Sequence, residues 1–121
     1  MNVTKFSVDS KLMGDIAVLY PRGYLNNIAG ESLVHACNSF IKKGVVKIIL
    51  NLSGTEFINS IGISLLLNIM EDLQDCGGML CFTNMSSIHK DTFEMLGLTK
   101  FISVFQGEED ALNNFNDGTR A

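Results

Sequence analysis

Residues 45–67 read VVKIILNLSGTEFINSIGISLLL, and this stretch decides the fold class. Residues 45–50 are β-branched and almost continuously apolar, which is typical of a strand buried on both faces of a parallel sheet. Residues 53–55 (SGT) then predict a turn, and a long apolar helix follows over about 61–76. A buried strand followed by a helix is a βα unit, so the stretch favours an α/β fold.

The predicted helix over about 61–76 has a wide apolar side. When its residues are placed around Leu66 at about 100° per residue, the apolar arc spans about 200°, whereas a surface helix usually needs little more than about 100°. The centre of the arc is formed by Gly62, Leu66, Ile69, Met70 and Leu73. We therefore expect its flanks to be covered by neighbouring elements or by a partner protein.

The chain before this unit predicts two strands and a helix. Residues 6–20 contain two apolar segments on either side of a turn at 13–15 (MGD), which indicates an antiparallel pair. Pro21 is expected to end this pairing, because it has no N–H to donate. Apolar residues at helical spacing then predict a helix over about 28–43, with Asn27 as its N-cap.

The chain after this unit continues to alternate strands and helices. A strand is expected over 79–83, a short helix over about 86–96 and a last strand over 101–105. Residues 108–110 (EED) place acidic side chains at the positive end of a final helix. Residues 116–121 are expected to form a frayed tail.

This order of elements predicts one α/β domain over residues 1–121, with an ordered core over about 3–115. The expected fold has an initial antiparallel strand and then four right-handed βα units, in a largely parallel or mixed sheet with flanking helices.

Composition and charge exclude several classes of protein. Hydrophobic residues make up 46% and charged residues 18% of the chain, as in a globular domain. A net charge of −4 argues against a nucleic-acid partner. Neither an apolar N-terminal run nor a stretch of about 18 apolar residues is present, so we expect no secretion and no membrane insertion. Three cysteines without C-x-x-C spacing fit a reducing cytoplasm and a protein without a disulfide framework or a zinc site of cysteines. Two histidines are too few for most metal sites, and we expect no metal and no cofactor.

Catalytic motifs are poorly matched. Ser60 lies in NSIG, which has only the second glycine of the G-x-S-x-G nucleophile motif. His35 and His89 are interpreted as ordinary residues of helix surfaces. The chain has no glycine-rich phosphate loop, and its central strand ends in Asn51, where a phosphate-accepting receiver domain would need aspartate. We therefore expect a protein that is not an enzyme.

Asn59 and Ser60 permit two interpretations. Either residue could simply cap the helix that follows. Alternatively, a hydroxyl beside the unpaired N–H groups of a helix N-terminus could accept a phosphoryl group, which would change the charge of the surface without unfolding the domain.

Three segments, in this order, resemble the STAS family, and in particular bacterial anti-sigma factor antagonists. Residues 50–67 (LNLSGTEFINSIGISLLL) are similar to the family's buried strand, short loop with an aromatic, and Asp-Ser-x-Gly opening an apolar helix. Residues 23–26 (GYLN) are similar to its Gly-x-Leu/Ile-Asp segment, and residues 93–102 (FEMLGLTKFI) to its helix-Gly-Leu ending. The resemblance extends over about residues 3–115 and implies a STAS fold.

The resemblance also implies a function and a site. The protein would bind an anti-sigma factor of the serine-kinase type and so release a sigma factor. The kinase would phosphorylate Ser60, which would weaken binding, and a serine phosphatase would reverse the modification. The expected partner-binding residues are Asn26, Asn27, Asn59, Ser60, Ile61, Gly62, Ile63 and Leu67.

The sequence departs from the family pattern at two positions. Asn26 and Asn59 stand where the family usually has aspartate, which removes two negative charges while keeping the ability to cap a helix. The protein could therefore be a constitutive, unphosphorylated STAS binding module. A STAS subunit that docks on the ATPase of a lipid-trafficking ABC transporter is another alternative, and the wide apolar arc also leaves room for a homodimer.

Overall fold

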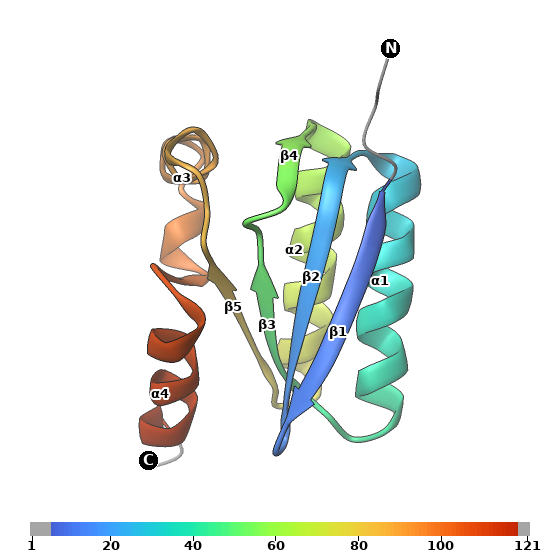
Figure 1. The fold of residues 1–121 in the computed structure, drawn as a ribbon, viewed down its shortest axis with the longest axis vertical. Coiled ribbons are helices and arrows are strands. Elements are labelled where there is room, and N and C mark those ends of the chain that lie inside the picture. Colours follow the sequence, from blue (N-terminus) through green and yellow to red (C-terminus); the bar gives the residue numbers. More distant parts are fainter. Residues whose placement is uncertain (1–5, 119–121) are drawn as a thin grey trace.

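The structure, a computed structural model, describes residues 6–118. Its helices and strands follow the chain in the order β1 (Ser7–Met13), β2 (Ile16–Leu25), α1 (Asn27–Lys42), β3 (Lys47–Asn51), β4 (Thr55–Ile58), α2 (Ser60–Asp75), β5 (Met79–Thr83), α3 (Ser87–Met95), the 3₁₀ turn η1 (Leu98–Lys100), β6 (Ser103–Phe105) and α4 (Glu108–Gly118) (Figure 1).

The sheet is mixed, as the sequence predicts. Its strand order is β1-β2-β3-β5-β6, and β4 pairs separately with β2. Among the described strands, the β1–β2 pair is antiparallel, and the pairs β2–β3, β2–β4, β3–β5 and β5–β6 are parallel. Strands β2, β4, β5 and β6 are the strands that precede α1, α2, α3 and α4, and β3 precedes β4; this alternation confirms an α/β fold with an initial antiparallel strand.

The sheet is covered on both faces. Ile48, Leu50 and Phe82 belong to a large core with residues of α1, α2 and α3, whereas Ile49 and Cys81 point to the other face and meet Ala111 and Phe115 of α4. Figure 1 shows α1 and α2 side by side, with α4 at the opposite side of the molecule. Because adjacent residues of β3 and β5 point to opposite cores, the continuous apolar runs of these strands are explained.

Pro21 does not end β2, contrary to the expectation from sequence, and pairs with Val8 of β1. The N–H of Gly23 faces away from β1 and donates to the Gly54 carbonyl oxygen at 2.9 Å. N–H groups two residues apart point to the same side of a strand. A backbone N–H at position 21 would therefore also face away from β1, and its absence in Pro21 does not interrupt the pairing with β1. The pairing of β2 with β3 ends at Leu19 and the pairing with β4 begins at Gly23, so the proline falls between the two.

Strand β4 and the true cap of α1 were not predicted from the sequence. A turn was expected over residues 53–55 and no strand was expected before the helix, but residues 55–58 form a short strand. The Thr55 hydroxyl donates to the Pro21 carbonyl oxygen at 2.7 Å. The expected cap, Asn27, is the first residue of α1, and Asn26 is the cap, since its side-chain oxygen accepts from the N–H of Ala29 at 3.0 Å.

Two further expectations are corrected. His35 is exposed, as expected, but His89 is buried with Phe93 one turn further along α3, because this face of α3 points toward the core. Residues 116–118, which were expected to belong to a frayed tail, are helical, because α4 continues to Gly118. Residues 3–5 of the expected core and residues 119–121 of the expected tail lie outside the described residues.

Candidate functional site

The helices α1 and α2 begin side by side at one edge of the sheet. Strands β2 and β4 pair in parallel as far as Leu25 and Ile58, and each is followed at once by an asparagine that caps the next helix. The backbone N–H of Asn59 donates to the carbonyl oxygen of Leu25 at 3.2 Å, which joins the two helix starts. Asn26 and Asn59 are therefore neighbours, and two positive helix ends point the same way.

Ser60 is the first residue of α2, and its side chain is exposed. The cap is Asn59, whose Oδ1 accepts from the N–H of Gly62 at 2.8 Å. The two interpretations of this pair are therefore compatible, because Asn59 performs the capping and Ser60 is presented to solvent. A phosphoryl group on Ser60 would lie near the first-turn N–H groups of α2, where negative charge is favourable.

Gly62 does not lie on the exposed surface, contrary to its expected contact with a partner. It is buried, and a Cβ at this position would meet the backbone carbonyl oxygen of Leu25. Glycine is thus required here for the close approach of α2 to β2.

Ile63 and Leu67, which were expected to bind a partner, are half-buried and pack against the large core. On the other flank of α2, Leu65 lies against Gly30 of α1. The wide apolar arc of α2 is therefore covered largely by neighbouring elements of the domain. This was one of the two ways in which its flanks were expected to be covered, the other being a partner protein.

Exposed apolar side chains gather around Ser60. Ile61 beside it is 51% exposed, and Phe57 of β4 is 65% exposed. The ring of Phe57 meets that of Tyr24 on β2 edge-to-face, with 5.9 Å between ring centroids. Ile28, in the first turn of α1, is also exposed. We call Tyr24, Ile28, Phe57, Ser60 and Ile61 the Ser60 surface.

The sequence-based set of site residues missed Tyr24, Ile28 and Phe57. A signal for two of them was present, because Tyr24 and Phe57 immediately precede the buried or half-buried residues Leu25 and Ile58. Period-2 alternation in a strand then places both rings on the opposite face from the core. An exposed pair of aromatic rings such as Tyr24 and Phe57 is a candidate contact point for a partner.

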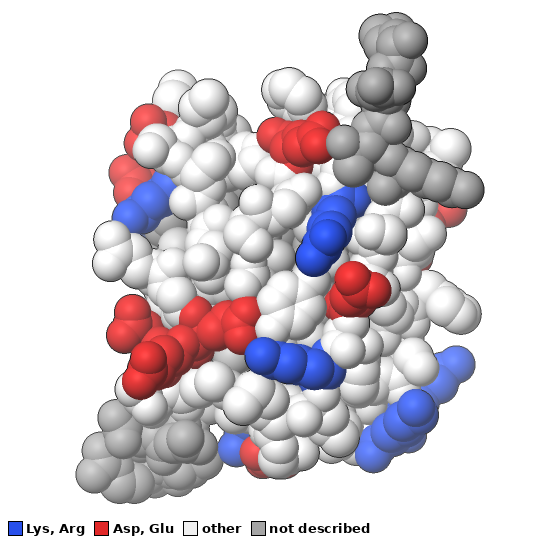
Figure 2. Space-filling view, viewed as in Figure 1, with Lys and Arg blue, Asp and Glu red and all other residues white. Residues whose placement is uncertain are grey.

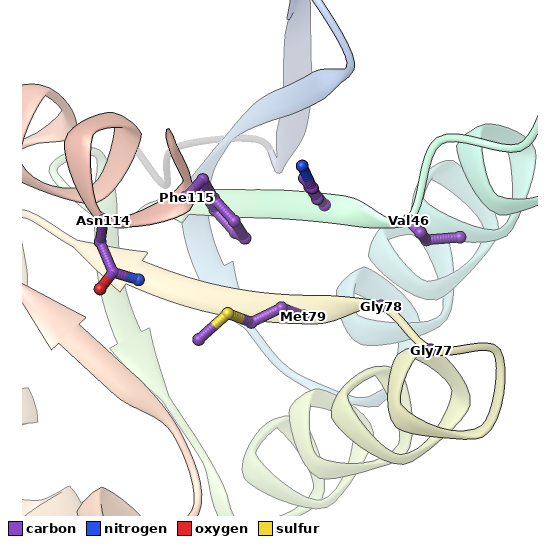
Figure 3. Close-up of a pocket in the computed structure, with 7 residues that line it drawn as sticks. Val46, Gly77, Gly78, Met79, Asn114 and Phe115 are labelled. Atoms are coloured by element: carbon purple, nitrogen blue, oxygen red, sulfur yellow. The ribbon is translucent and has the colours of Figure 1, made fainter. Parts of the chain in front are cut away.

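A cavity lined by apolar residues lies near the amino ends of β3 and β5 (Figure 3), and none of its lining residues belongs to the Ser60 surface. It measures about 380 Å³ and is lined by Val46, Lys47, Gly77, Gly78, Met79, Asn114 and Phe115. Lys47 is its charged residue, and its ammonium group pairs with Asp15 at 3.1 Å. The cavity thus presents mainly apolar walls and no convergent set of reactive groups.

The described residues offer little for catalysis or metal binding. Burial raises the pKa of the Cys37 and Cys81 thiols to about 12, so neither provides a thiolate near neutral pH. No group of three or more His, Cys, Asp or Glu side chains within residues 6–118 could hold a metal ion. In the same part of the chain, no helix has the length and hydropathy needed to span a bilayer.

Surface charge in the view of Figure 2 is mixed. Basic and acidic side chains are interspersed on this face, and its largest acidic group lies where α4 begins with Glu108, Glu109 and Asp110. This face therefore lacks the continuous basic patch that a nucleic-acid-binding surface needs.

Comparison with known proteins gives consistent matches over most of the chain. A protein of Thermotoga maritima named "Putative anti-sigma factor antagonist" is 24% identical over 104 residues, which cover 84% of this chain and 91% of the relative. The crystal structure of a Thermotoga maritima protein described in the same words matches with a TM-score of 0.82 at 21% identity, covering 88% of this chain and 92% of the other.

The anti-sigma factor antagonist SpoIIAA in its unphosphorylated form matches with a TM-score of 0.71 at 22% identity, covering 94% and 99% of the two chains. The Bacillus cell fate determinant SpoIIAA in its phosphorylated form matches with a TM-score of 0.69 at 24% identity, covering 92% and 99%. At these identities the structures establish a shared fold. The STAS domain family model matches residues 7–111, and the chain therefore belongs to the STAS domain family.

Proposed function

We propose that this protein is an anti-sigma factor antagonist that is switched by phosphorylation of Ser60. The observation that carries the proposal is the exposure of Ser60 at the start of α2, within an exposed apolar surface and beside a separate residue that caps the helix. Support also comes from the names of the relatives, and from the phosphorylated and unphosphorylated forms of SpoIIAA among the similar structures.

In the unphosphorylated state, the Ser60 surface binds an anti-sigma factor, and a sigma factor held by that protein is released. The apolar side chains of Tyr24, Phe57 and Ile61 supply buried area at the contact. Asn26, Asn27 and Asn59 surround it with polar groups at the starts of α1 and α2. The partner is a serine kinase, and a serine phosphatase restores the binding form.

Phosphorylation adds nearly two negative charges at the centre of this contact. In the free protein, the first turn of α2 stabilises them, so the domain stays folded. In the complex, they have to be desolvated against an apolar interface, which weakens binding. The switch thus acts on the interface and leaves the fold unchanged.

The test compares the affinity of the anti-sigma factor for the wild type, Ser60→Ala and Ser60→Asp by calorimetry. Ser60→Ala should bind within about threefold of the wild type, and Ser60→Asp should lose tenfold or more, about 1.4 kcal/mol. Ser39→Asp is the control for added charge, since Ser39 is exposed near the other end of α1. If Ser60→Asp binds as tightly as Ser60→Ala, the proposed switch is wrong.

A second measurement addresses the modification itself. After incubation with the kinase and ATP, intact-mass spectrometry should show one added phosphoryl group on the wild type and none on Ser60→Ala. Asn59→Asp restores the carboxylate that the family usually carries and should be phosphorylated faster, if that carboxylate orients the hydroxyl. A wild type that binds the kinase but gains no mass would instead be a constitutive antagonist.

A further inference from the structure

Strand β1 forms an open edge of the sheet (Figure 1). It pairs with β2 on one side, and no strand within residues 6–118 pairs with its other side. Its seven residues pair with β2 in continuous register, and six of the seven are exposed. Proteins usually protect a regular edge of this kind from other strands, and here two charged side chains, Asp9 and Lys11, are the features that do so.

The backbone groups of β1 that point outward belong to Val8, Ser10 and Leu12. Met13 and Ile16 flank the two-residue turn between β1 and β2, and such a flanking pair exchanges both of its backbone hydrogen bonds. Hydrogen-bonded and non-hydrogen-bonded pairs alternate along an antiparallel ladder, so the odd-numbered residues of β1 bond to β2 and the even-numbered residues point outward. The proline of β2 agrees with this alternation, because it lies opposite Val8, where no hydrogen bonds are exchanged.

A second copy of β1 matches this edge in one antiparallel register. When a twofold axis passes through Ser10, Val8 lies opposite Leu12 of the second copy, and the outward backbone groups of both strands meet. In this register all seven residues are paired, and Asp9 lies opposite Lys11 on both sides of the axis. These charged pairs occupy the non-hydrogen-bonded positions, where opposing side chains are closest. The two charges that repel other strands therefore attract this one.

Other registers are disfavoured. An axis through position 9 or 11 places Asp9 opposite Asp9 or Lys11 opposite Lys11, and like charges directly opposite each other are destabilising. An axis through Val8 or Leu12 pairs only three residues of each strand. An axis between two residues sets outward groups against groups that already bond to β2. The charge pattern of β1 thus favours one closed, symmetric pairing.

The face of β1 toward α4 is prepared for the charged pairs. The Lys11 ammonium lies 3.4 Å from Glu108 Oε1 and 5.6 Å from the centre of the Tyr20 ring, and the side chain is still 48% exposed. It has three N–H donors, so the contact with Glu108 leaves donors for a second carboxylate. Asp9 is exposed on the same face and has no ion pair among the described residues.

The opposite face of β1 carries an exposed apolar side chain. Leu12 is 55% exposed and Ser10 is exposed as well, so the neighbouring helix α1 does not cover this part of the strand. In the symmetric register, Leu12 contacts Val8 of the second copy, and both Leu12 side chains lose exposure.

We propose that β1 is the contact of a homodimer, in which the β1 strands of two copies pair antiparallel about Ser10 and join two sheets into one. A contact made by one short strand from each copy is small, so the dimer forms and separates reversibly. No residue of β1 belongs to the Ser60 surface, and the inference does not rest on the proposed function.

Charge reversal tests the register. Sedimentation velocity over a concentration series should show a monomer–dimer equilibrium for the wild type. Lys11→Glu places a glutamate opposite Asp9, and Asp9→Lys places a lysine opposite Lys11, so each should dimerise at least tenfold less tightly. An equimolar mixture of these two variants restores opposite charges at every charged pair and should dimerise at least as tightly as the wild type. Lys90→Glu, at an exposed position of α3, is the control for the change of charge and should dimerise as the wild type does.

Ser10→Pro tests the backbone pairing. It removes the central outward N–H and none that bonds to β2, so the domain should fold and should dimerise at least tenfold less tightly. Equal unfolding midpoints check that the variants fold.

A wild type that remains monomeric up to its solubility limit would overturn the proposal. A dimer that both charge reversals and Ser10→Pro leave unchanged would also overturn it, because the contact would then lie on another face of the domain. If the mixture of Lys11→Glu and Asp9→Lys fails to dimerise although both variants are folded, the register about Ser10 is wrong.

Discussion

At the scale of single residues, the start of α2 divides two tasks between neighbouring side chains. Asn59 uses its amide oxygen for the N–H of Gly62, and Ser60 extends into solvent. If Ser60 were the cap, its hydroxyl oxygen would be engaged by a backbone N–H and would be less accessible to a kinase. The observed arrangement lets the hydroxyl change its chemical state while α2 remains capped.

Gly30 in α1 and Gly62 in α2 should differ in how much stability the domain loses when each is replaced by alanine. In Gly62→Ala the added methyl group would meet the backbone carbonyl of Leu25, which cannot move without displacing β2. In Gly30→Ala it would meet the terminal Cδ1 of Leu65, a flexible side chain. Alanine favours a helix over glycine by about 1 kcal/mol at both positions, so the difference reports the packing.

We expect Gly62→Ala to lower the free energy of unfolding by about 1–3 kcal/mol, and by at least 1 kcal/mol more than Gly30→Ala. Urea denaturation followed by circular dichroism measures both variants. Equal stabilities would show that the approach of α2 to β2 tolerates a side chain.

At the scale of the elements, β4 determines how the candidate site is built. This strand pairs with β2 beyond the point where β3 has left it, and it thereby brings the end of β4 beside the end of β2. Both helices that follow start at the same edge, with Asn26 and Asn59 as their caps. The four residues of β4 include an exposed glutamate and an exposed phenylalanine, so the sequence contains no apolar run that predicts this strand.

Replacing the capping residue of α1 or of α2 should lower the free energy of unfolding by similar amounts. Asn26→Ala and Asn59→Ala each leave one first-turn N–H, that of Ala29 or Gly62, without its side-chain acceptor. Each should lower the free energy of unfolding by about 1 kcal/mol. Asn26→Asp and Asn59→Asp should stay within a few tenths of a kcal/mol of the wild type or be slightly more stable, because a carboxylate caps equally well and favours the positive helix end. Urea unfolding at pH 7 measures all four variants, and unchanged stability of both alanine variants would contradict the assignment of the caps.

At the scale of the whole molecule, α4 is attached to the sheet by a polar network as well as by Ala111 and Phe115. The Asn51 side-chain amide at the end of β3 donates to Glu108 Oε2 at 2.6 Å, and Lys11 of β1 pairs with Glu108 Oε1 at 3.4 Å. Asn51 also accepts from the N–H of Ser53 at 3.0 Å, so this residue orders the turn before β4. Asn51, which stands where a receiver domain would need aspartate, thus has a structural role in holding α4.

The Glu108 network predicts a dependence of stability on pH. Burial alone would raise the pKa of the Glu108 carboxyl, but hydrogen bonds from Asn51, Tyr20 and Lys11 and the charge of Lys11 lower it below its ordinary value of 4.5. The unfolded chain then takes up this proton at a higher pH than the folded one. The contribution of Glu108 is complete above about pH 5 and is lost as the pH falls through 4.5 to the lowered folded-state pKa.

Glu108→Gln keeps the hydrogen-bond acceptor and removes the charge. Its free energy of unfolding should be about 1 kcal/mol lower than that of the wild type at pH 7, and the difference should shrink below pH 4. Glu109→Gln, an exposed neighbour in the first turn of α4, is the control and should change little. Urea unfolding between pH 3 and pH 7 measures the difference, and a gap that persists at pH 3 would contradict the role of the Glu108 charge.

The sequence by itself determined the order of the elements apart from β4, the α/β class, the buried central strands and the long apolar helix that follows Ser60. These features follow from the spacing of apolar residues and from capping and turn residues, which act between positions close together in the chain. Only the tertiary structure decided that β4 pairs with β2, that Asn26 lies beside Asn59, that Gly62 and His89 are buried, and that Tyr24 and Phe57 meet edge-to-face at the surface. Each of these results depends on contacts between residues far apart in sequence, which local periodicity does not record.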